Sequence, residues 1–249
     1  MIKIKNICII TDFDHTLTSK ESKSTWDVLE SIENIPKKCK EESRKNRKFY
    51  LPKEKDYKIS FSKKKKYMKE WLEKNLNIFT KCEITKSHVK KVSNKKDIMK
   101  FRKGVKTFLK YTNKENIPVI IVSAGISDII KNYLKANNLL FNNIYVISNE
   151  FKYKNKKIIG FKNKHIHSLN KDKIKIPISI KKTISKKEKI ILLGDNVEDT
   201  LIAPKGREED IIKIGFLDSI QNLNTFKKYY DIIYKNETFK DILKLIKKS

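Results

Sequence analysis

Short runs of aliphatic and β-branched residues occur once near the start of the chain and repeatedly in its second half. Runs of this length, bounded by polar residues, are typical of buried strands. They lie at residues 7–11, 119–122, 144–147, 190–193, 211–214 and 232–234. Helical stretches, among them residues 127–136 and 239–246, separate several of them. Strands and helices in alternation predict an α/β fold with a parallel sheet and helices on both faces.

Between residues 20 and 103 the hydrophobic pattern changes to a helical period. One stripe is formed by Val28, Leu29, Ile32 and Ile35, and a second by Met68, Trp71, Leu72, Leu76 and Phe79. We interpret both stripes as core faces. No glycine precedes Gly104, which also favours helices. Because a parallel crossover needs only about a dozen residues, we predict a helical cap inserted at residues 19–103. The core then comprises residues 1–18 and 104–249, and the cap lies over the carboxyl ends of the strands.

The net charge of +29 raises the question of nucleic-acid binding. Only four of the 58 basic residues are arginines, and the lysines are spread over the whole chain. Base readout favours arginine, and stacking platforms need interleaved aromatic residues. We therefore expect no specific nucleic-acid partner, and we attribute the charge to a lysine-rich surface that attracts anionic substrates.

Cysteine usage and the lack of long apolar runs bear on the compartment. The first strand begins at residue 7, which leaves no room for a signal peptide, and no apolar run is long enough to span a bilayer. Cys8, Cys39 and Cys82 show neither metal-site spacing nor a disulfide framework. We expect reduced thiols in a cytoplasmic protein with no membrane partner. We take the protein to be a monomer.

Two carboxylates follow the first strand in the sequence Asp12-Phe13-Asp14-His15-Thr16. A carboxylate is costly to desolvate unless it has a partner. Phosphoryl-transfer sites need one carboxylate to attack phosphorus and one to move protons, both near a metal ion. By itself, however, this pattern fits a strand exit with solvated aspartates equally well.

Three more signals lie downstream. Ser123-Ala124-Gly125 follows the second strand, where a hydroxyl and backbone N–H groups can bind phosphate, although an ordinary strand-to-helix turn explains it better in isolation. Asp195 follows the strand at 190–193 and can complete a Mg²⁺ site, and Asp199 lies one helical turn further on. A helix N-cap explains this pair as well.

Lys171 can hold both an aspartate nucleophile and a phosphate, but in so lysine-rich a chain it is weak evidence alone. His165 and His167 can bind a metal only with a third ligand, and we interpret them as polar side chains.

In this order, the four motifs resemble those of the haloacid dehalogenase-like superfamily of phosphatases. The closer resemblance is to the cytosolic 5′-nucleotidase III or pyrimidine 5′-nucleotidase family. It rests on residues 11–17, 123–128, 160–162, 166–171, 190–195 and 212–217, with residues 67–71 in the cap. The resemblance implies a Rossmann-like core with a small helical cap inserted after the first motif. It also implies Mg²⁺-dependent hydrolysis of nucleoside 5′-monophosphates, chiefly pyrimidine ones, through an aspartyl-phosphate.

The resemblance also assigns roles to individual residues. Asp12 is implied as the nucleophile, Asp14 as the general acid and base, and Lys171 as the catalytic lysine that also binds the phosphate. The implied metal ligands are Asp12, Asp14 and Asp195. The implied phosphate contacts are Ser123 and Ala124, the base contact is Glu54, and the supporting residues are Thr16, Gly125 and Asp199. Asn75 departs from the family pattern, in which a serine commonly faces the base.

Two alternatives remain at this point. One keeps the chemistry and changes the reaction partner, which gives a phosphatase or phosphotransferase for another small phosphate. The other is a basic nucleic-acid-binding protein on the same scaffold.

Overall fold

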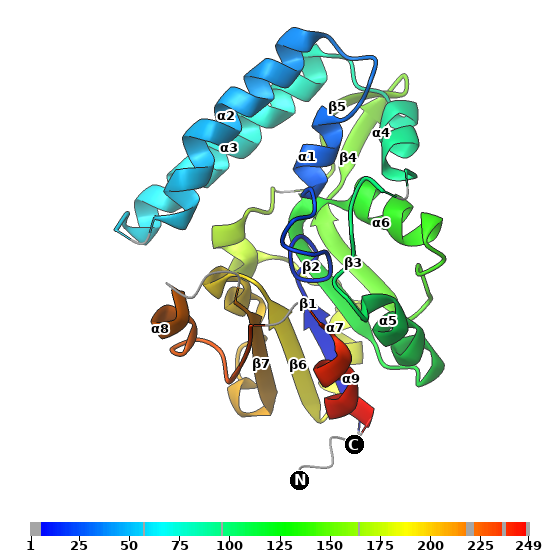
Figure 1. Cartoon of the computed structure of the whole chain (residues 1–249), viewed down its shortest axis with the longest axis vertical. Coiled ribbons are helices and arrows are strands. Elements are labelled where there is room, and N and C mark those ends of the chain that lie inside the picture. Colours follow the sequence, from blue (N-terminus) through cyan, green and yellow to red (C-terminus); the bar gives the residue numbers. More distant parts are fainter. Residues whose placement is uncertain are drawn as a thin grey trace.

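The computed structural model describes residues 6–56, 58–95, 97–163, 165–217, 222–235 and 238–247. Figure 1 shows a sheet flanked by helices, with a long helical hairpin projecting from one end. In chain order the elements are β1 (Ile7–Thr11), α1 (Thr25–Glu30), α2 (Lys37–Lys55), α3 (Phe61–Lys81), α4 (Lys86–Ser93), α5 (Val105–Lys114), β2 (Val119–Ile126), α6 (Ser127–Ala136), β3 (Ile144–Asn149), β4 (Phe151–Lys154), β5 (Lys157–Phe161), η1 (Ser168–Lys173), α7 (Ile178–Ser185), β6 (Lys189–Gly194), η2 (Val197–Ile202), η3 (Glu208–Asp210), β7 (Ile211–Phe216), α8 (Leu223–Phe226), β8 (Ile232–Tyr234) and α9 (Lys240–Lys247).

The six-stranded sheet has the order β3-β2-β1-β6-β7-β8, and each neighbouring pair is parallel. The predicted α/β fold is therefore confirmed. The chain starts at the middle strand β1, builds one half of the sheet outward to β3, and then crosses to β6 on the other side of β1. The strand order reverses between β1 and β6, and ligands bind at such a reversal in open α/β sheets.

The alternation of side chains along the strands explains the two layers of helices. In β1, Ile7 and Ile9 pack in the cluster formed with α5, α6 and α9, whereas Cys8 and Ile10 pack in the cluster formed with α7 and α8. Successive residues of a strand point to opposite faces. A strand that is apolar on both faces is thus buried on both, as the continuous aliphatic runs predict.

A two-stranded antiparallel sheet of β4 and β5 is absent from the sequence prediction. Its connection is the two-residue turn Asn155-Lys156, and both residues have positive φ, 49° and 65°. Turns of this geometry match the twist of a hairpin, and asparagine tolerates that backbone conformation. Lysines alternate with the apolar residues here, so the pattern does not stand out from the rest of the lysine-rich chain.

The region between β1 and β2 is helical, as predicted. Helices α2 and α3 pair with one another and form the projecting hairpin, whereas α1 and α4 lie against α6. The first predicted stripe is buried in the main core. The second stripe is divided, because Phe79 packs in that core while Met68, Trp71 and Leu72 also line a cavity. The division of the chain at residues 19 and 104 stays a prediction, and residues 1–5, 248 and 249 lie outside the described part.

The expectation of three reduced thiols is wrong for two of them. Cys39 and Cys82 form a disulfide that connects the start of α2 to the end of α3. The two helices run antiparallel, so these ends meet although 43 positions separate them. Cys8 is a buried free thiol, and burial raises its pKa to about 11. Among the described residues no helix is both long and apolar enough to cross a membrane.

Candidate active site

The carboxyl ends of β1 and β6 bring the first and last sequence motifs together. The two strands are paired in register, with Thr11 opposite Leu193, and the Asp12 N–H donates to the Leu193 carbonyl at 3.1 Å. Asp12 therefore follows β1 where Asp195 follows β6. This is the point at which the strand order reverses, so both carboxylates lie where this sheet topology places a ligand.

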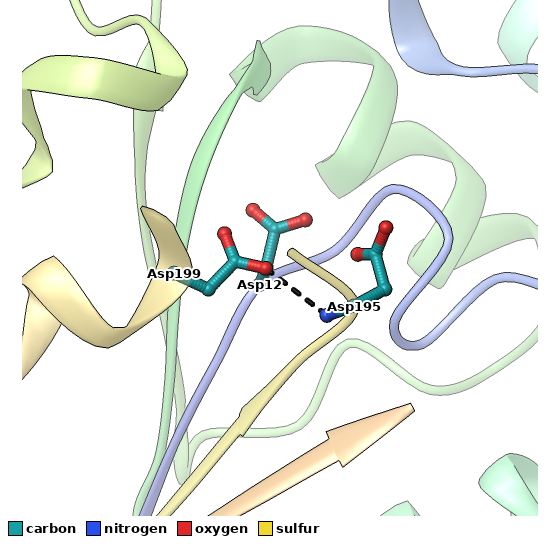
Figure 2. Close-up of side chains that lie close together, drawn as sticks. All are labelled: Asp12, Asp195 and Asp199. Carbon is teal, nitrogen blue, oxygen red and sulfur yellow. Dashed lines mark hydrogen bonds between the residues drawn. The ribbon is translucent and has the colours of Figure 1, made fainter. Parts of the chain in front are cut away.

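Carboxylate oxygens of Asp12, Asp195 and Asp199 all lie within 4.8 Å of one another. Figure 2 shows the three side chains above the strand ends, with the hydrogen bond from the Asp195 backbone N–H to Asp199. Carboxylate oxygens are the ligands that Mg²⁺ prefers, and Mg²⁺ often takes only one or two of them. The donor set therefore fits a hard divalent cation.

The three carboxylates differ in how they are held. Asp199 Oδ1 accepts from Lys171 at 2.7 Å, and its Oδ2 accepts from the backbone N–H groups of Asp195 and Asn196 at 3.0 Å. Asp195 Oδ1 accepts from the Thr16 hydroxyl at 2.6 Å. Because both oxygens of Asp199 are engaged by protein donors, Asp199 is better suited to positioning its neighbours than to coordinating a metal.

Lys171 is 4% exposed and lies between two of these carboxylates. Its ammonium group donates to Asp12 Oδ1 and Asp199 Oδ1, each at 2.7 Å. Burial alone would lower the pKa of Lys171, but the adjacent Asp12 and Asp199 raise it above the ordinary value. Burial raises the pKa of Asp12, and Lys171 opposes that shift. The lysine therefore stays charged and compensates the buried carboxylates.

Asp14 lines the same cavity and is held by the first residue of α1. Its carboxylate accepts three hydrogen bonds from Thr25, two from the backbone N–H at 3.0 and 3.1 Å and one from the hydroxyl at 2.8 Å. Burial raises the pKa of Asp14, while His15 and the Thr25 hydrogen bonds lower it. A carboxyl group with a raised pKa suits proton transfer near neutral pH. Its side chain is not part of the three-carboxylate cluster.

The end of β2 also lines the site, through Ser123, Ala124 and Gly125. Ser123 is buried, and its hydroxyl accepts from the Gly125 N–H at 3.0 Å. The Ala124 carbonyl accepts from Trp26 Nε1 at 3.1 Å and Asn149 Nδ2 at 2.8 Å. A Cβ on Gly125 would lie 2.3 Å from the Thr25 hydroxyl oxygen and 2.9 Å from Asp14. Only glycine fits there.

A cavity of about 660 Å³ joins these residues to the helical hairpin. That volume is within the usual range for small-molecule sites. On the catalytic side, Asp12, Asp14, Ser123, Lys171 and Asp195 line it. On the hairpin side it is lined by Leu51, Glu54, Met68, Trp71, Leu72 and Asn75.

Glu54, the predicted base contact, and Asn75, which departs from the family pattern, thus line the same cavity as the catalytic motifs. Glu54 Oε1 accepts from the Ser168 hydroxyl at 2.6 Å. Asn75 is buried, and its Oδ1 accepts from Asn46 Nδ2 at 3.4 Å. The role of Glu54 toward a base stays a prediction.

Sequence reasoning missed several residues that hold the site in place. Thr25 binds Asp14, Arg102 donates to the His15 carbonyl at 3.0 Å, and the Tyr230 hydroxyl donates to the Asn196 carbonyl. None of these contacts is encoded by local spacing. Of the histidines, His167 Nδ1 accepts from the Leu169 N–H at 3.2 Å, and His165 packs edge-on against Phe161. Neither histidine belongs to the group of described residues that could hold a metal ion.

Comparison with solved structures identifies the class to which this architecture belongs. Cytosolic 5′-nucleotidase IIIB bound to cytidine has a TM-score of 0.87 at 24% identity, covering 98% of this chain and 85% of that one. A substrate-bound phosphoserine phosphatase has a TM-score of 0.63 at 20% identity, covering 98% of this chain and 100% of that one. At such identities the likeness shows the fold alone, which this chain shares with these two phosphate-releasing enzymes.

Sequence comparison then gives the family. The sequence model of the pyrimidine 5′-nucleotidase (UMPH-1) family matches residues 9–248, and this chain belongs to that family. The 7-methylguanosine phosphate-specific 5′-nucleotidase of Homo sapiens is 29% identical over 245 residues, covering 94% of this chain and 81% of that protein. Form A of that enzyme from Xenopus laevis is 30% identical over 249 residues, covering 94% and 84%. The predicted resemblance is confirmed, and the protein is a 5′-nucleotidase, a hydrolase of nucleotides.

Proposed function

We propose that this 5′-nucleotidase hydrolyses nucleoside 5′-monophosphates in a Mg²⁺-dependent reaction through a phosphorylated Asp12. The observation that carries the proposal is the buried arrangement of Asp12, Lys171 and Asp199 beside Asp195, where the strand order reverses. Asp12 and Asp195 would hold the metal, and Asp199 would keep Lys171 and the Asp195 backbone in place. When bound, Mg²⁺ supplies positive charge that offsets the charge on the phosphate.

In the first step an oxygen of Asp12 attacks phosphorus, and the bond between phosphorus and the ribose 5′-oxygen breaks. Asp14 gives its proton to that oxygen, so the nucleoside leaves as a neutral alcohol. The Lys171 ammonium and the Ser123 hydroxyl stabilise the charge on the transferring phosphoryl group. Lys171 is already fixed between two carboxylates, so little reorganisation accompanies the reaction.

In the second step water attacks the phosphorylated Asp12. Asp14, now ionised, takes a proton from the water as the new oxygen–phosphorus bond forms and the bond to Asp12 breaks. Phosphate leaves, and both aspartates return to their starting states. The same carboxyl group thus acts first as an acid and then as a base, which suits the raised pKa that burial gives Asp14.

The hairpin of α2 and α3 is the part of the predicted cap that we propose selects the base. Tyr50 and Met68 of the hairpin form a small apolar cluster with Leu169 of η1, separate from the main core, which the hairpin joins near the end of α3, through Ile78 and Phe79. A carboxylate such as Glu54 accepts hydrogen bonds from an exocyclic amine. Cytosine and 7-methylguanine both carry one, and uracil does not. We therefore propose cytidine and 7-methylguanosine monophosphates as substrates ahead of uridine monophosphate.

The test is release of phosphate from a panel of nucleoside monophosphates, with Mg²⁺ or excess chelator. Asp12→Asn, which is nearly isosteric, should abolish turnover and leave the circular dichroism spectrum unchanged. Asp172→Asn, in the same turn as Lys171 but outside the carboxylate cluster, serves as the control. Full activity in chelator, or substantial activity of Asp12→Asn, overturns the proposal. Adding nucleoside acceptors to the same assay measures any phosphotransferase reaction.

We further propose that the protein works in the cytoplasm as a monomer that binds no nucleic acid specifically. The name of the cytosolic structural relative supports the compartment. The Cys39–Cys82 disulfide is the observation against it, because disulfides are rare in reducing compartments. The test is to alkylate free thiols at the moment of cell lysis and to map the modified cysteines. Modified Cys39 and Cys82 support a reducing compartment, and unmodified ones show that the disulfide forms in the cell.

A further inference from the structure

Thr25 holds the carboxylate of Asp14 through both its backbone and its side chain. Its backbone N–H and its hydroxyl both donate to Asp14. The residue is fully buried at the first position of α1. Residues 15–24, which connect it to Asp14, form no strand and no helix. Asp14 therefore depends on a residue outside its own motif for its orientation.

The geometry around the Thr25 hydroxyl fixes the direction of its single proton. The Ile126 N–H donates to that hydroxyl oxygen at 3.1 Å, while the hydroxyl donates to Asp14 Oδ2 at 2.8 Å. One hydroxyl provides one donor and up to two acceptor sites. With the end of β2 occupying an acceptor site, the proton is directed toward Asp14.

Gly125 makes this close approach possible. A Cβ at that position would lie 2.3 Å from the Thr25 oxygen, a distance that no real side chain tolerates. The hydroxyl of Thr25 thus sits between Asp14 and the end of β2, and it ties the loop after β1 to the start of α1. A carboxyl group held from two directions in this way keeps one orientation.

We infer that Thr25 is the positioning residue for the proton transfer performed by Asp14. The inference rests on the role proposed for Asp14 above. Thr25 is not among the residues that line the cavity. It acts by holding the carboxyl group of Asp14 in line with the leaving 5′-oxygen, and small errors of orientation are costly in such a step.

Leaving-group dependence is a readout that a merely structural role would not change. A ribose 5′-oxygen is a poor leaving group and needs the proton, whereas 4-nitrophenolate departs without one. Since kcat/KM covers the steps through departure of the alcohol, its ratio for the two substrates isolates the acid step. Asp14→Asn comes first and should lower kcat/KM for the nucleotide far more than for 4-nitrophenyl phosphate. If it lowers both equally, the proposed role of Asp14 fails, independently of Thr25.

Thr25→Val removes the hydroxyl and keeps the size of the side chain. We expect kcat/KM for the nucleotide to fall by about 10- to 100-fold, with much less change for 4-nitrophenyl phosphate. Thr25→Ser restores the hydroxyl and should recover most of the loss. The matched control is Thr112→Val, at an equally buried threonine whose hydroxyl donates within α5, and it should leave the ratio unchanged.

Equal losses on both substrates, or no loss at all, overturn the inference while leaving Asp14 in place. If Thr25→Val does not fold, Thr25→Ala replaces it in the same comparison. A Thr25→Ser variant as impaired as the valine or alanine variant also overturns the inference, because the hydroxyl would then not be the effective group.

Discussion

Replacing Lys171 by methionine tests whether this lysine is what makes the carboxylate cluster tolerable in the folded protein. Lys171→Met keeps the length of the side chain and removes the charge that lies 2.7 Å from both Asp12 and Asp199. Breaking a buried ion pair by removing one partner costs about 3–5 kcal/mol, since the other charge is left uncompensated. We expect the free energy of unfolding to fall by that amount in excess chelator, and turnover to be lost.

The sign of the pH dependence follows from the carboxylate. Burial raises the pKa of Asp12 above its value in the unfolded chain, so the folded protein binds that proton more tightly. Stability of the metal-free protein should therefore fall as pH rises above the ordinary aspartate pKa. Lys171 opposes the rise in the pKa of Asp12, so removing it should raise that pKa further. The loss in free energy of unfolding caused by Lys171→Met should therefore be larger at pH 8 than at pH 5.

Urea unfolding followed by the fluorescence of Trp26 and Trp71 measures both effects. Lys162→Met is the matched control, because Lys162 makes an ion pair of the same 2.7 Å length with Glu150 at the surface. Exposed pairs contribute little, so this variant should unfold like the parent. A Lys171→Met variant that also unfolds like the parent at pH 8 would refute the reasoning. Added Mg²⁺ should recover part of the lost stability, since it compensates the same carboxylates.

Three further outcomes are expected. Glu54→Gln should change the preference for cytidine over uridine monophosphate, by roughly 5- to 150-fold if an unpaired buried acceptor costs about 1–3 kcal/mol, and should leave 4-nitrophenyl phosphate hydrolysis unchanged. Equal kinetics on all substrates would remove Glu54 from base selection. Asp195→Asn should raise the Mg²⁺ concentration for half-maximal activity, whereas Asp241→Asn on α9 should not; identical metal titrations would contradict the assigned ligand. Replacing Cys39 and Cys82 together by serine should lower the free energy of unfolding by up to about 4 kcal/mol, given the 43-residue separation, and a thermal unfolding curve unchanged by this replacement would show that the disulfide stabilises nothing.

The sheet was predictable because its strands are buried on both faces. A run such as Ile190-Ile191-Leu192-Leu193 has no polar face to present, so it marks a central parallel strand without further context. The carboxylates at the strand ends were predictable for the same reason, since their positions follow from where each run stops. The β4–β5 hairpin was missed because lysines on its solvent side resemble lysines everywhere else in this chain.

The contacts that hold the catalytic groups were not predictable from local spacing. Thr25 reaches Asp14 only because α1 folds back over the end of β2, and nothing in the intervening sequence encodes that path. The Cys39–Cys82 pair likewise depends on two antiparallel helices of matching length. In both cases the tertiary arrangement sets the contact, while the sequence sets only the elements.

The hairpin of α2 and α3 contacts the two turns η1 and η2, which carry Lys171 and Asp199. Glu54 of α2 accepts from Ser168, three positions before Lys171 in η1. Lys64 of α3 lies 3.9 Å from Glu198, the neighbour of Asp199 in η2, and both side chains are largely buried.

If Glu54 reads the base as proposed above, the base shares that carboxylate with Ser168. Because Ser168 and Lys171 both lie in η1, the proposed selection of the base is connected to the placement of Lys171. A substitution in the α2–α3 hairpin that displaces Ser168 should therefore lower kcat as well as raise KM, even though it lies across the cavity from Asp12.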